Sequence, residues 1–367
     1  MLEMADVFRR YGGAYLKMFG DTMLPSHRRA FQDILSCRTP IRGGHVFSCS
    51  RCGQQVYAYH SCRNRSCPKC HGRDTQTWLQ ARHAELLPVP YFHVVFTLPM
   101  EWRRVVRQHQ KSLYSILMKA AAGALIKLAA DPHYVGGLIG VMTILHTWTR
   151  TLEYHPHIHC LVPAGGVSDD RRWRSARKNY LVPVKALSRL FRGLFKELVA
   201  RQLPELKMPK SVRGQDWVVY CKPSVQGAEA VLKYLGRYVH RIAITNSRIV
   251  SIDDGNVTFR YQRCGDSKWR TMTLAANEFI RRFLQHVLPR GVHKVRYYGL
   301  WAPANRRLLH QVQLLLAAEG SAEPSHEARR HNESTPTPKP HGQVCPHCGE
   351  GELVCIGRLP ANGRAPP

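Results

Sequence analysis

Acidic side chains are scarce in this 367-residue sequence, where 25 Asp and Glu stand against 54 Lys and Arg, for a formal net charge of +29. The N-terminal stretch MLEMADVFRRYGGAY lacks the pattern of a secretory signal peptide. The sequence also lacks a long uncharged apolar run, because residues 113–130, the longest apolar stretch, contain two lysines. These absences argue against a secreted or membrane-spanning protein. We therefore expect a cytoplasmic protein that has no membrane partner.

The excess of basic residues indicates the kind of partner. A strongly positive surface attracts polyanions, and nucleic acid is the first candidate. The basic residues are interleaved with Tyr and Trp along the whole chain, as is typical of proteins that hold phosphates and stack on bases. A ribosome-associated protein or a protein bound to a membrane surface is the alternative.

The sequence divides into four predicted regions. Residues 1–85 should form a helical entry and a zinc-binding domain, and residues 86–302 should form the main catalytic domain. A helix and a flexible linker rich in polar residues and proline are expected over residues 303–344, before a small zinc knuckle at 345–367. In the main domain strand patterns alternate with helix patterns, and Asp254-Gly255-Asn256 supplies a hairpin turn. The predicted fold class is α+β, with a central antiparallel sheet and flanking helices.

Cysteines are concentrated near the N-terminus, where six of the twelve lie between Cys37 and Cys70. Reduced cysteines in a cytoplasmic protein are most simply interpreted as metal ligands. Two pairs of the form Cys-x-x-Cys, separated by fourteen residues, predict one tetrahedral and therefore structural zinc site. Its ligands would be Cys49, Cys52, Cys67 and Cys70.

The remaining metal-binding side chains suggest further sites. A second candidate zinc site consists of Cys37, His45, His60 and Cys62, although the two cysteines could instead be small core residues. The C-terminal group consists of Cys345, Cys348 and Cys355, and His347 or His341 would complete it.

Paired histidines form the candidate catalytic centre. His157 and His159 lie at positions i and i+2 of an apolar strand, so both imidazoles should leave the same face and reach one metal ion. His146, on the preceding strand, is the predicted third ligand. Phosphate oxygens could fill the open positions of a Mn²⁺ or Mg²⁺ ion. His93, His155, Glu153 and Gln262 are the reserve ligands.

Two tyrosines are the candidate nucleophiles. Tyr234 and Tyr238 are spaced to stack on one face of a helix. Lys233, Arg237 and Arg241 repeat at the same interval beside them, and these cations would favour the phenolate and bind DNA. Such spacing is more often found in packing residues, so the assignment depends on the histidine pair upstream.

Together these segments resemble a known family. The segments GGHVFSCSRCGQQVYAYHSCRNRSCPKC, FHVVFTLP, HTWTRTLEYHPHIHCLVPAGG, YLGRYVHRIAITNSR and NEFIRRFLQHVLPRGVHKVRYYG resemble the rolling-circle insertion-sequence transposases. The resemblance covers about residues 30–302. It implies a zinc-binding domain, a two-tyrosine HUH endonuclease domain, and partners that are single-stranded DNA at element ends and a target DNA. It also implies a bacterial protein that acts at the nucleoid, for which a homodimer is a further expectation.

Three alternatives differ in their chemistry or target. A carboxylate-triad transposase is disfavoured, because acidic residues are rare at the predicted strand ends. A zinc-dependent DNA-binding protein without nuclease chemistry would not need the histidine pair or the tyrosines. A plasmid replication initiator would share the nuclease residues and differ only in its DNA target.

Overall fold

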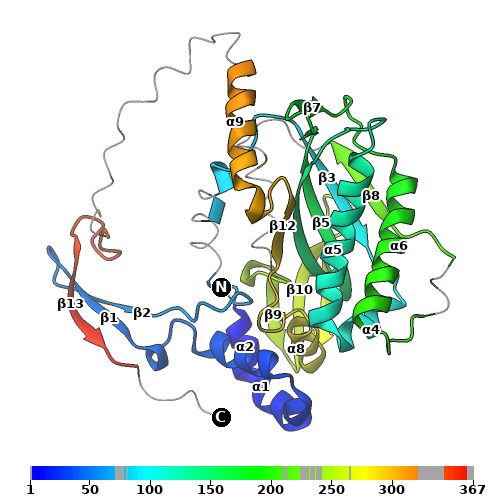
Figure 1. Cartoon of the computed structure of the whole chain (residues 1–367). Coiled ribbons are helices and arrows are strands. Elements are labelled where there is room, and N and C mark those ends of the chain that lie inside the picture. The colour runs from blue at the N-terminus through cyan, green and yellow to red at the C-terminus, as the bar shows by residue number, and fades with distance from the viewer. Residues whose placement is uncertain are drawn as a thin grey trace.

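The computed structural model describes residues 2–70, 78–79, 82–209, 212, 214–223, 231, 236, 242–263, 266–320 and 343–361. Its centre is a five-stranded sheet in the order β12-β4-β5-β3-β8, in which every neighbouring pair is antiparallel (Figure 1). The strands are β3 (Tyr91–Thr97), β4 (Gly140–Trp148), β5 (Tyr154–Pro163), β8 (Val219–Pro223) and β12 (Val295–Gly299). The predicted α+β class with a central antiparallel sheet is confirmed.

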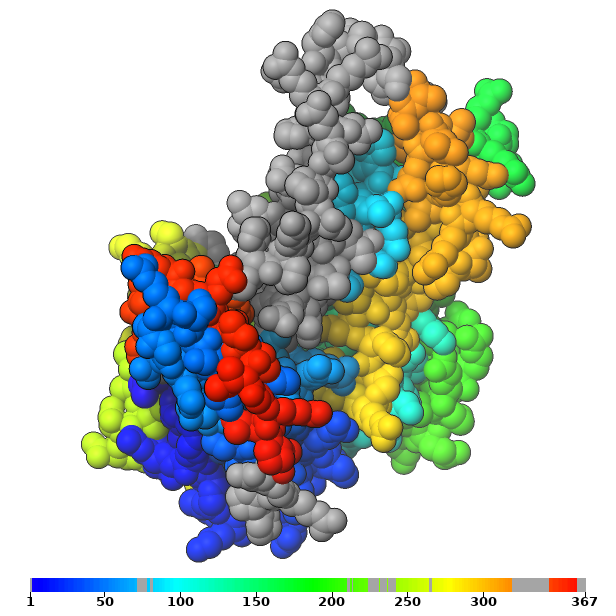
Figure 2. All heavy atoms as spheres, turned by 90° about the vertical axis from the view of Figure 1, so that its left-hand side faces the viewer, coloured from blue at the N-terminus to red at the C-terminus, as the bar shows by residue number. Residues whose placement is uncertain are grey.

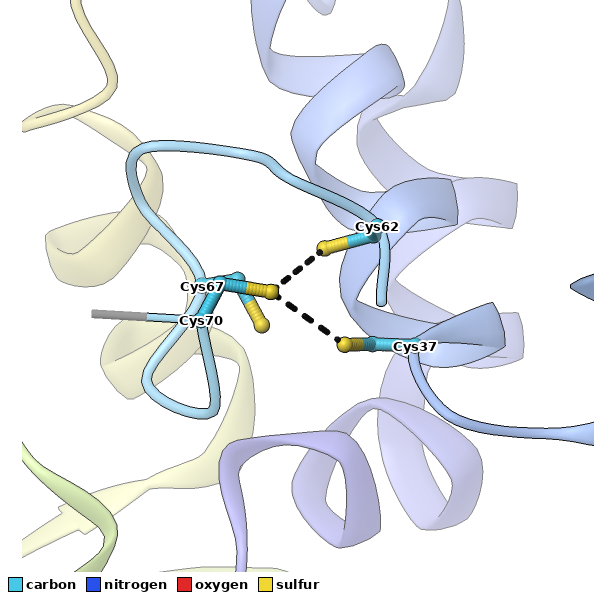
Figure 3. Close-up of side chains that lie close together, drawn as sticks. All are labelled: Cys37, Cys62, Cys67 and Cys70. Carbon is cyan, nitrogen blue, oxygen red and sulfur yellow. Dashed lines mark hydrogen bonds between the residues drawn. The ribbon is translucent and has the colours of Figure 1, made fainter. Parts of the chain in front are cut away.

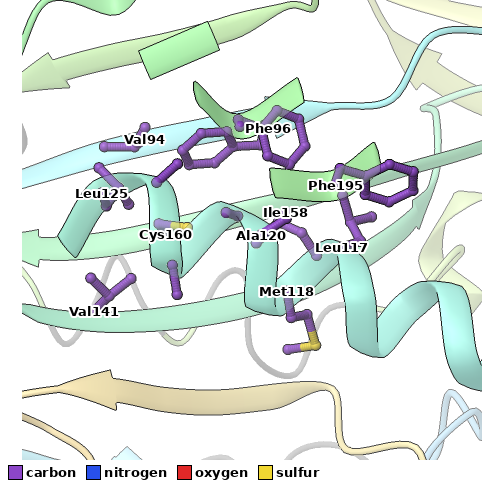
Figure 4. Close-up of a cluster of buried hydrophobic side chains, with 14 of the residues drawn as sticks. Val94, Phe96, Leu117, Met118, Ala120, Leu125, Val141, Ile158, Cys160 and Phe195 are labelled. Atoms are coloured by element: carbon purple, nitrogen blue, oxygen red, sulfur yellow. The ribbon is translucent and has the colours of Figure 1, made fainter. Parts of the chain in front are cut away.

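Helices cover one face of this sheet. They are α4 (Trp102–Gln108), α5 (Gln110–Ala129) and α6 (Val184–Gln202). Strand alternation turns Ile158, Cys160 and Val162 of β5 toward these helices, where they pack with fully buried side chains such as Leu117 of α5 and Phe195 of α6 (Figure 4). Among the described helices, α5 is long and apolar enough to span a membrane, but most of it is buried in this core.

The opposite face of the sheet divides into an apolar part and a polar part. Its apolar part, including Met142 and Leu161, packs with Leu309 and Val312 of α9 (Arg306–Gly320). The histidines continue the same side-chain rows along β4 and β5. The two-stranded sheet of β6 (Gly165–Val167) and β7 (Trp173–Ser175) follows β5.

A second hydrophobic core forms between the three-stranded sheet β11-β10-β9 and three helices. It comprises β9 (Ile249–Asp253), β10 (Asn256–Gln262), β11 (Trp269–Ala275), α8 (Ala276–Leu284), α1 (Met4–Phe19) and α2 (Pro25–Ser36). The predicted hairpin turn lies between β9 and β10, where Asp254 and Gly255 both have positive φ. Phe8, Phe31 and Phe283 join α1, α2 and α8 in one core.

A fourth sheet joins segments near the two ends of the chain. β1 (Gly44–Cys49) and β2 (Gln55–Tyr59) form a hairpin, and β13 (Leu353–Leu359) pairs antiparallel with the other edge of β1. In Figure 2 the C-terminal segment lies along this hairpin on the molecular surface. The C-terminal segment is thus an integral part of an N-terminal sheet.

Candidate functional site

Three histidines converge on the face of the central sheet opposite α5 and α6. His146 and His157 are register partners across β4 and β5, and His159 is two residues farther along β5 on the same face. One ring nitrogen from each of the three lies within 4.8 Å of the others. Since His146 is almost fully buried and the other two are partly buried, the cluster opens to solvent on the side of β5.

Neighbouring groups fix the orientation of two of these rings. The Nδ1 of His157 lies 2.6 Å from the carbonyl oxygen of His155, to which it must donate its proton, so the Nε2 of His157 carries the lone pair. The Nδ1 of His159 lies 2.8 Å from the Nε2 of His93 on β3. Burial lowers the pKa of His93 to about 4, so this second imidazole is neutral at pH 7. Such outer partners are typical of metal-binding histidines.

The donor set suits a catalytic divalent ion better than a structural one. Three imidazoles can bind a transition metal and leave coordination positions for other ligands. The reserve ligands have other roles: His93 contacts His159, the Nδ1 of His155 lies 2.7 Å from Arg103, and the amide of Gln262 donates to the carbonyl of Ser267. Glu153 is exposed in the turn before β5.

Hydrogen bonds from Gln285 and His286 hold the turn that leads into β5. Leu152 has a φ of +64°, a backbone angle that residues other than glycine rarely adopt. Its carbonyl accepts hydrogen bonds from the amide of Gln285 at 2.9 Å and from the Nε2 of His286 at 3.1 Å. The Nδ1 of His286 accepts a hydrogen bond from Thr147 on β4 at 3.2 Å. His286, two residues after α8, therefore contacts both β4 and the turn that leads into β5.

The predicted nucleophiles and their basic neighbours lie outside the described residues. These are Tyr234, Tyr238, Lys233, Arg237 and Arg241. Two residues of the same segment are described, and both are helical. Val231 is buried in the apolar cluster that contains Ile144 and Leu161, and a Cβ at Gly236 would lie 3.2 Å from Leu79.

The cysteines form two clusters instead of the predicted grouping. Cys67 and Cys70 join Cys37 and Cys62, so the prediction that they share a zinc site with Cys49 and Cys52 is wrong (Figure 3). The Cys70 sulfur lies 3.5 Å from the sulfurs of both Cys37 and Cys62. The reason is geometric: α2 ends at Ser36 and delivers Cys37 directly to the loop that carries the other three.

Cys49 and Cys52 instead meet the C-terminal pair. The Cys49 sulfur lies 3.6 Å from that of Cys348, and the Cys52 sulfur lies 3.8 Å from that of Cys345. In the part of the chain that the structure describes, the predicted ligands His45, His60, His347 and Cys355 lie outside both clusters, and His341 is not among the described residues. His45 and His60 pack against each other, with ring centroids 5.1 Å apart, and the Cys355 sulfur lies 3.9 Å from the Nδ1 of His45.

Both cysteine clusters fit zinc. A tetrahedral zinc ion with Zn–S bonds of about 2.3 Å places its sulfurs about 3.8 Å apart, close to the distances observed. Hydrogen bonds from the Cys62 and Cys67 side chains lower the pKa of Cys37, whereas the hydrogen bond to Cys37 raises the pKa of Cys67. Four thiols packed this closely cannot all ionise without a cation among them.

One hollow lies beside the histidine cluster, and a second hollow adjoins the first. The first has a volume of about 330 Å³, is mostly apolar, and is lined by Trp148, whose ring stacks on His146 at a centroid distance of 4.7 Å. The second, of about 960 Å³, shares Arg65 and Leu288 with the first. Its cationic lining comprises Arg29, Arg63, Arg65, Arg107, Lys111 and Arg290. The carboxylate in this lining, Asp33, is already engaged by Arg42 and Asn64.

Comparison with known proteins supplies the family. Residues 7–98 match the family model of a transposase zinc-binding domain of the IS91 type, and residues 140–308 match the family described as "Putative transposase". The chain is 40% identical to "Putative transposase y4qJ" of Sinorhizobium fredii, over 96% of this chain and 94% of that protein. It is 28% identical to the transposase for insertion sequence element IS801 of Pseudomonas savastanoi pv. phaseolicola, over 73% of this chain and 68% of that protein.

No solved structure matches the chain. The zinc-binding model covers the whole Cys37 cluster, and the transposase model covers His146, His157 and His159. Together, the two domain matches and the near full-length similarity to y4qJ show that the chain belongs to the IS91/IS801 family of insertion-sequence transposases, which transpose by rolling circle.

Proposed function

We propose that this transposase nicks and rejoins single-stranded DNA at the ends of its insertion sequence through HUH-type chemistry. His146, His157 and His159 hold a divalent Mn²⁺ or Mg²⁺ ion, and Tyr234 and Tyr238 are the nucleophiles. The observation that carries the proposal is the convergence of three imidazoles on one sheet face, with two of their rings oriented by His93 and the His155 carbonyl.

The chemistry follows from a tyrosine nucleophile. When bound, the divalent ion supplies Lewis acidity to a backbone phosphate. The tyrosine oxygen attacks phosphorus, the new O–P bond forms as the bond to the 3′ oxygen breaks, and the phenolic proton is released to solvent while the leaving oxygen takes one up. The products are a 5′-phosphotyrosyl link and a free 3′-OH. Attack by the 3′-OH of a second strand reverses the step and joins DNA without ATP.

The described neighbours of the tyrosines support this assignment. Val231 packs with Ile144 and Leu161, which are each two residues from a histidine of the cluster on the same strand face. Gly236 lies between the two tyrosines in sequence and approaches Leu79. Val231, three residues before Tyr234, therefore packs on the histidine-bearing face. Lys233, Arg237 and Arg241 would bind DNA phosphates beside the two tyrosines.

The two hollows suggest a path for a single strand. Phosphates would follow the cationic second hollow, while one base enters the apolar first hollow and contacts Trp148, next to His146. Arg65 lies in both hollows, although its guanidinium also donates to the carbonyls of Val292 and Leu288. This path would bring the phosphate beside the inserted base toward the histidines.

The remaining parts of the proposal concern partners and location. The Cys37 cluster holds a structural zinc ion within a DNA-binding domain, and residues 86–302 form the catalytic domain. The protein acts on element ends and on target DNA at the nucleoid in the bacterial cytoplasm, and two copies can pair as a homodimer to hold both element ends.

The test is formation of a covalent protein–DNA complex. Purified protein is incubated with end-labelled single-stranded oligonucleotides from the element ends in Mn²⁺, and the products are separated on a denaturing gel. We expect a shifted protein–DNA band that requires the metal and is lost in the Tyr234→Phe/Tyr238→Phe double variant.

Two outcomes would reject the assignment. A band that survives in the double variant would exclude these nucleophiles. Absence of any band, with tight DNA binding that does not require added Mn²⁺ or Mg²⁺, would indicate a zinc-dependent DNA-binding protein. Tyr180→Phe, at an exposed tyrosine between β7 and α6, is the matched control and should leave the band unchanged.

A further inference from the structure

We infer that the C-terminal segment and the β1–β2 hairpin form one split zinc ribbon, in which Cys49, Cys52, Cys345 and Cys348 bind a single zinc ion. The matched zinc-binding family model ends at residue 98 and contains only the first two of these cysteines. The transposase model ends at residue 308 and contains none of the four. The inference is independent of the proposed nuclease chemistry.

The two cysteine pairs have the same local conformation. Each is a Cys-x-x-Cys-Gly sequence, and the glycines, Gly53 and Gly349, have φ values of +69° and +71°. The N–H of each glycine donates to the carbonyl of the first cysteine of its pair, at 3.1 Å for Cys49 and 2.9 Å for Cys345. Glycine is needed at this turn because other residues rarely adopt such a φ.

Backbone amides in both pairs also point at sulfur. The N–H of Arg51 donates to the sulfur of Cys49, and the N–H of His347 donates to the sulfur of Cys345, each at 3.4 Å. Hydrogen bonds of this kind favour the thiolate, which is the form that binds a metal. Two segments near opposite ends of the chain thus each bring to the other a pair of cysteines whose backbone favours metal binding.

The packing between the segments leaves little freedom. Ser50 and Glu352 exchange two hydrogen bonds, from the Ser50 N–H to the Glu352 carbonyl at 2.9 Å and from the Glu352 N–H to the Ser50 hydroxyl at 3.1 Å. A Cβ at Gly351 would lie only 2.3 Å from the Cys49 sulfur. Strand β13 continues this contact along β1, as the surface view shows (Figure 2).

The donor set decides which cofactor binds and what it does. Four sulfurs at tetrahedral spacing suit zinc, and they leave no open position for substrate, so the site is structural. Each segment supplies only two thiolates, so neither completes the site alone. The ion would therefore fasten the C-terminal segment to the N-terminal sheet.

Zinc stoichiometry of the purified full-length protein, measured by mass spectrometry of the released metal, tests the shared site. We expect Cys49→Ser/Cys52→Ser and Cys345→Ser/Cys348→Ser each to lose one zinc ion per chain relative to the unaltered protein. The variant with all four changes should lose the same single ion. The control Cys355→Ser, on β13 outside the cluster, should lose none. Loss of two ions in the four-cysteine variant, or of none, would overturn the proposal.

A second experiment has a main arm that keeps all four cysteines and so does not depend on the folding of a cysteine variant. A protease recognition sequence is inserted between residues 325 and 340, and the cleaved protein is passed over a sizing column. The C-terminal fragment should co-elute with the body in zinc and separate in a chelator. With Cys345→Ser/Cys348→Ser it should separate even in zinc. Co-elution that is unchanged by chelator and by this variant would show that zinc does not hold the two segments together.

Discussion

His146 and His157 face each other directly across the β4–β5 pair, with ring centroids 5.5 Å apart on the side of the sheet away from α5. The hydrogen bond from His157 to the carbonyl of His155 uses only the backbone of His155. The neighbouring histidine side chain can therefore be removed without disturbing this bond, which gives a matched pair of variants.

The first prediction uses that pair. His157→Ala should abolish metal-dependent cleavage, because it removes one of three imidazole ligands, and should leave single-stranded DNA binding without added Mn²⁺ or Mg²⁺ nearly unchanged. His155→Ala should retain cleavage. Gel assays of cleavage and fluorescence anisotropy of binding are the measurements. Equal loss of cleavage in both variants, or parallel loss of binding in His157→Ala, would mean that His157 has a structural role.

The second prediction concerns the outer partner His93. His93→Phe removes the contact with the Nδ1 of His159 and retains an aromatic ring in the sheet. Loss of such a partner typically weakens metal affinity by about 10–100-fold. The concentration of Mn²⁺ that gives half-maximal cleavage should rise accordingly, and the rate at saturating Mn²⁺ should change less. An unchanged metal requirement would show that His93 does not support the site.

The third prediction addresses the apolar hollow. Trp148→Ala should weaken binding of single-stranded DNA by about 1–3 kcal/mol, the usual contribution of one stacked base. Binding is measured without added Mn²⁺ or Mg²⁺ and with zinc retained, so that an effect on metal binding through His146 does not contribute. Trp269→Ala, at an exposed tryptophan on β11, is the control. If both variants bind like the unaltered protein, the first hollow does not hold a base.

The fourth prediction concerns the cationic hollow. Lys111 and Lys119 are both exposed lysines of α5, but only Lys111 lines the hollow. For single-stranded DNA, each phosphate contact contributes about 0.7 to the slope of log affinity against log salt. Lys111→Ala should lower the slope by about this amount, and Lys119→Ala should leave it unchanged. Equal slopes in the two variants would exclude the hollow as the phosphate path.

The fifth prediction concerns stability in acid. Burial lowers the pKa of His286 to about 3 and that of His27 to about 4, both below the ordinary 6.5. The unfolded chain therefore binds more protons in this range. As far as these two histidines contribute, the free energy of unfolding should stay constant above pH 6.5. It should fall as the pH decreases toward 4.

His286→Phe isolates one of these groups. The His286→Phe variant should lose melting temperature less steeply with acid than the unaltered protein does. At pH 7 it should cost about 1–3 kcal/mol, because Thr147 loses its buried partner. The two proteins are compared at equal zinc concentration, so that acid loss of zinc affects both. Identical declines would contradict a neutral, buried His286.

The sequence by itself determined the features of this protein that depend only on residues close together in the chain. Alternation along a strand depends only on neighbouring residues, so the pairing of His157 and His159 on one face and the Asp254-Gly255 turn could be predicted directly. His146 was predicted as a third ligand on the preceding strand, and the pairing of β4 with β5 places it opposite His157. The placement of Tyr234 and Tyr238 stays a prediction.

Only the tertiary structure decided how the cysteines are grouped. Cys49-x-x-Cys52 and Cys67-x-x-Cys70 have a spacing that suits one zinc site, yet the chain divides them between two clusters. Cys52 and Cys345 are 293 positions apart, and no local pattern brings them together. Metal coordination requires only that sulfurs meet in space, so the pairing depends on β13 joining the edge of β1, a contact that forms only once the chain has folded.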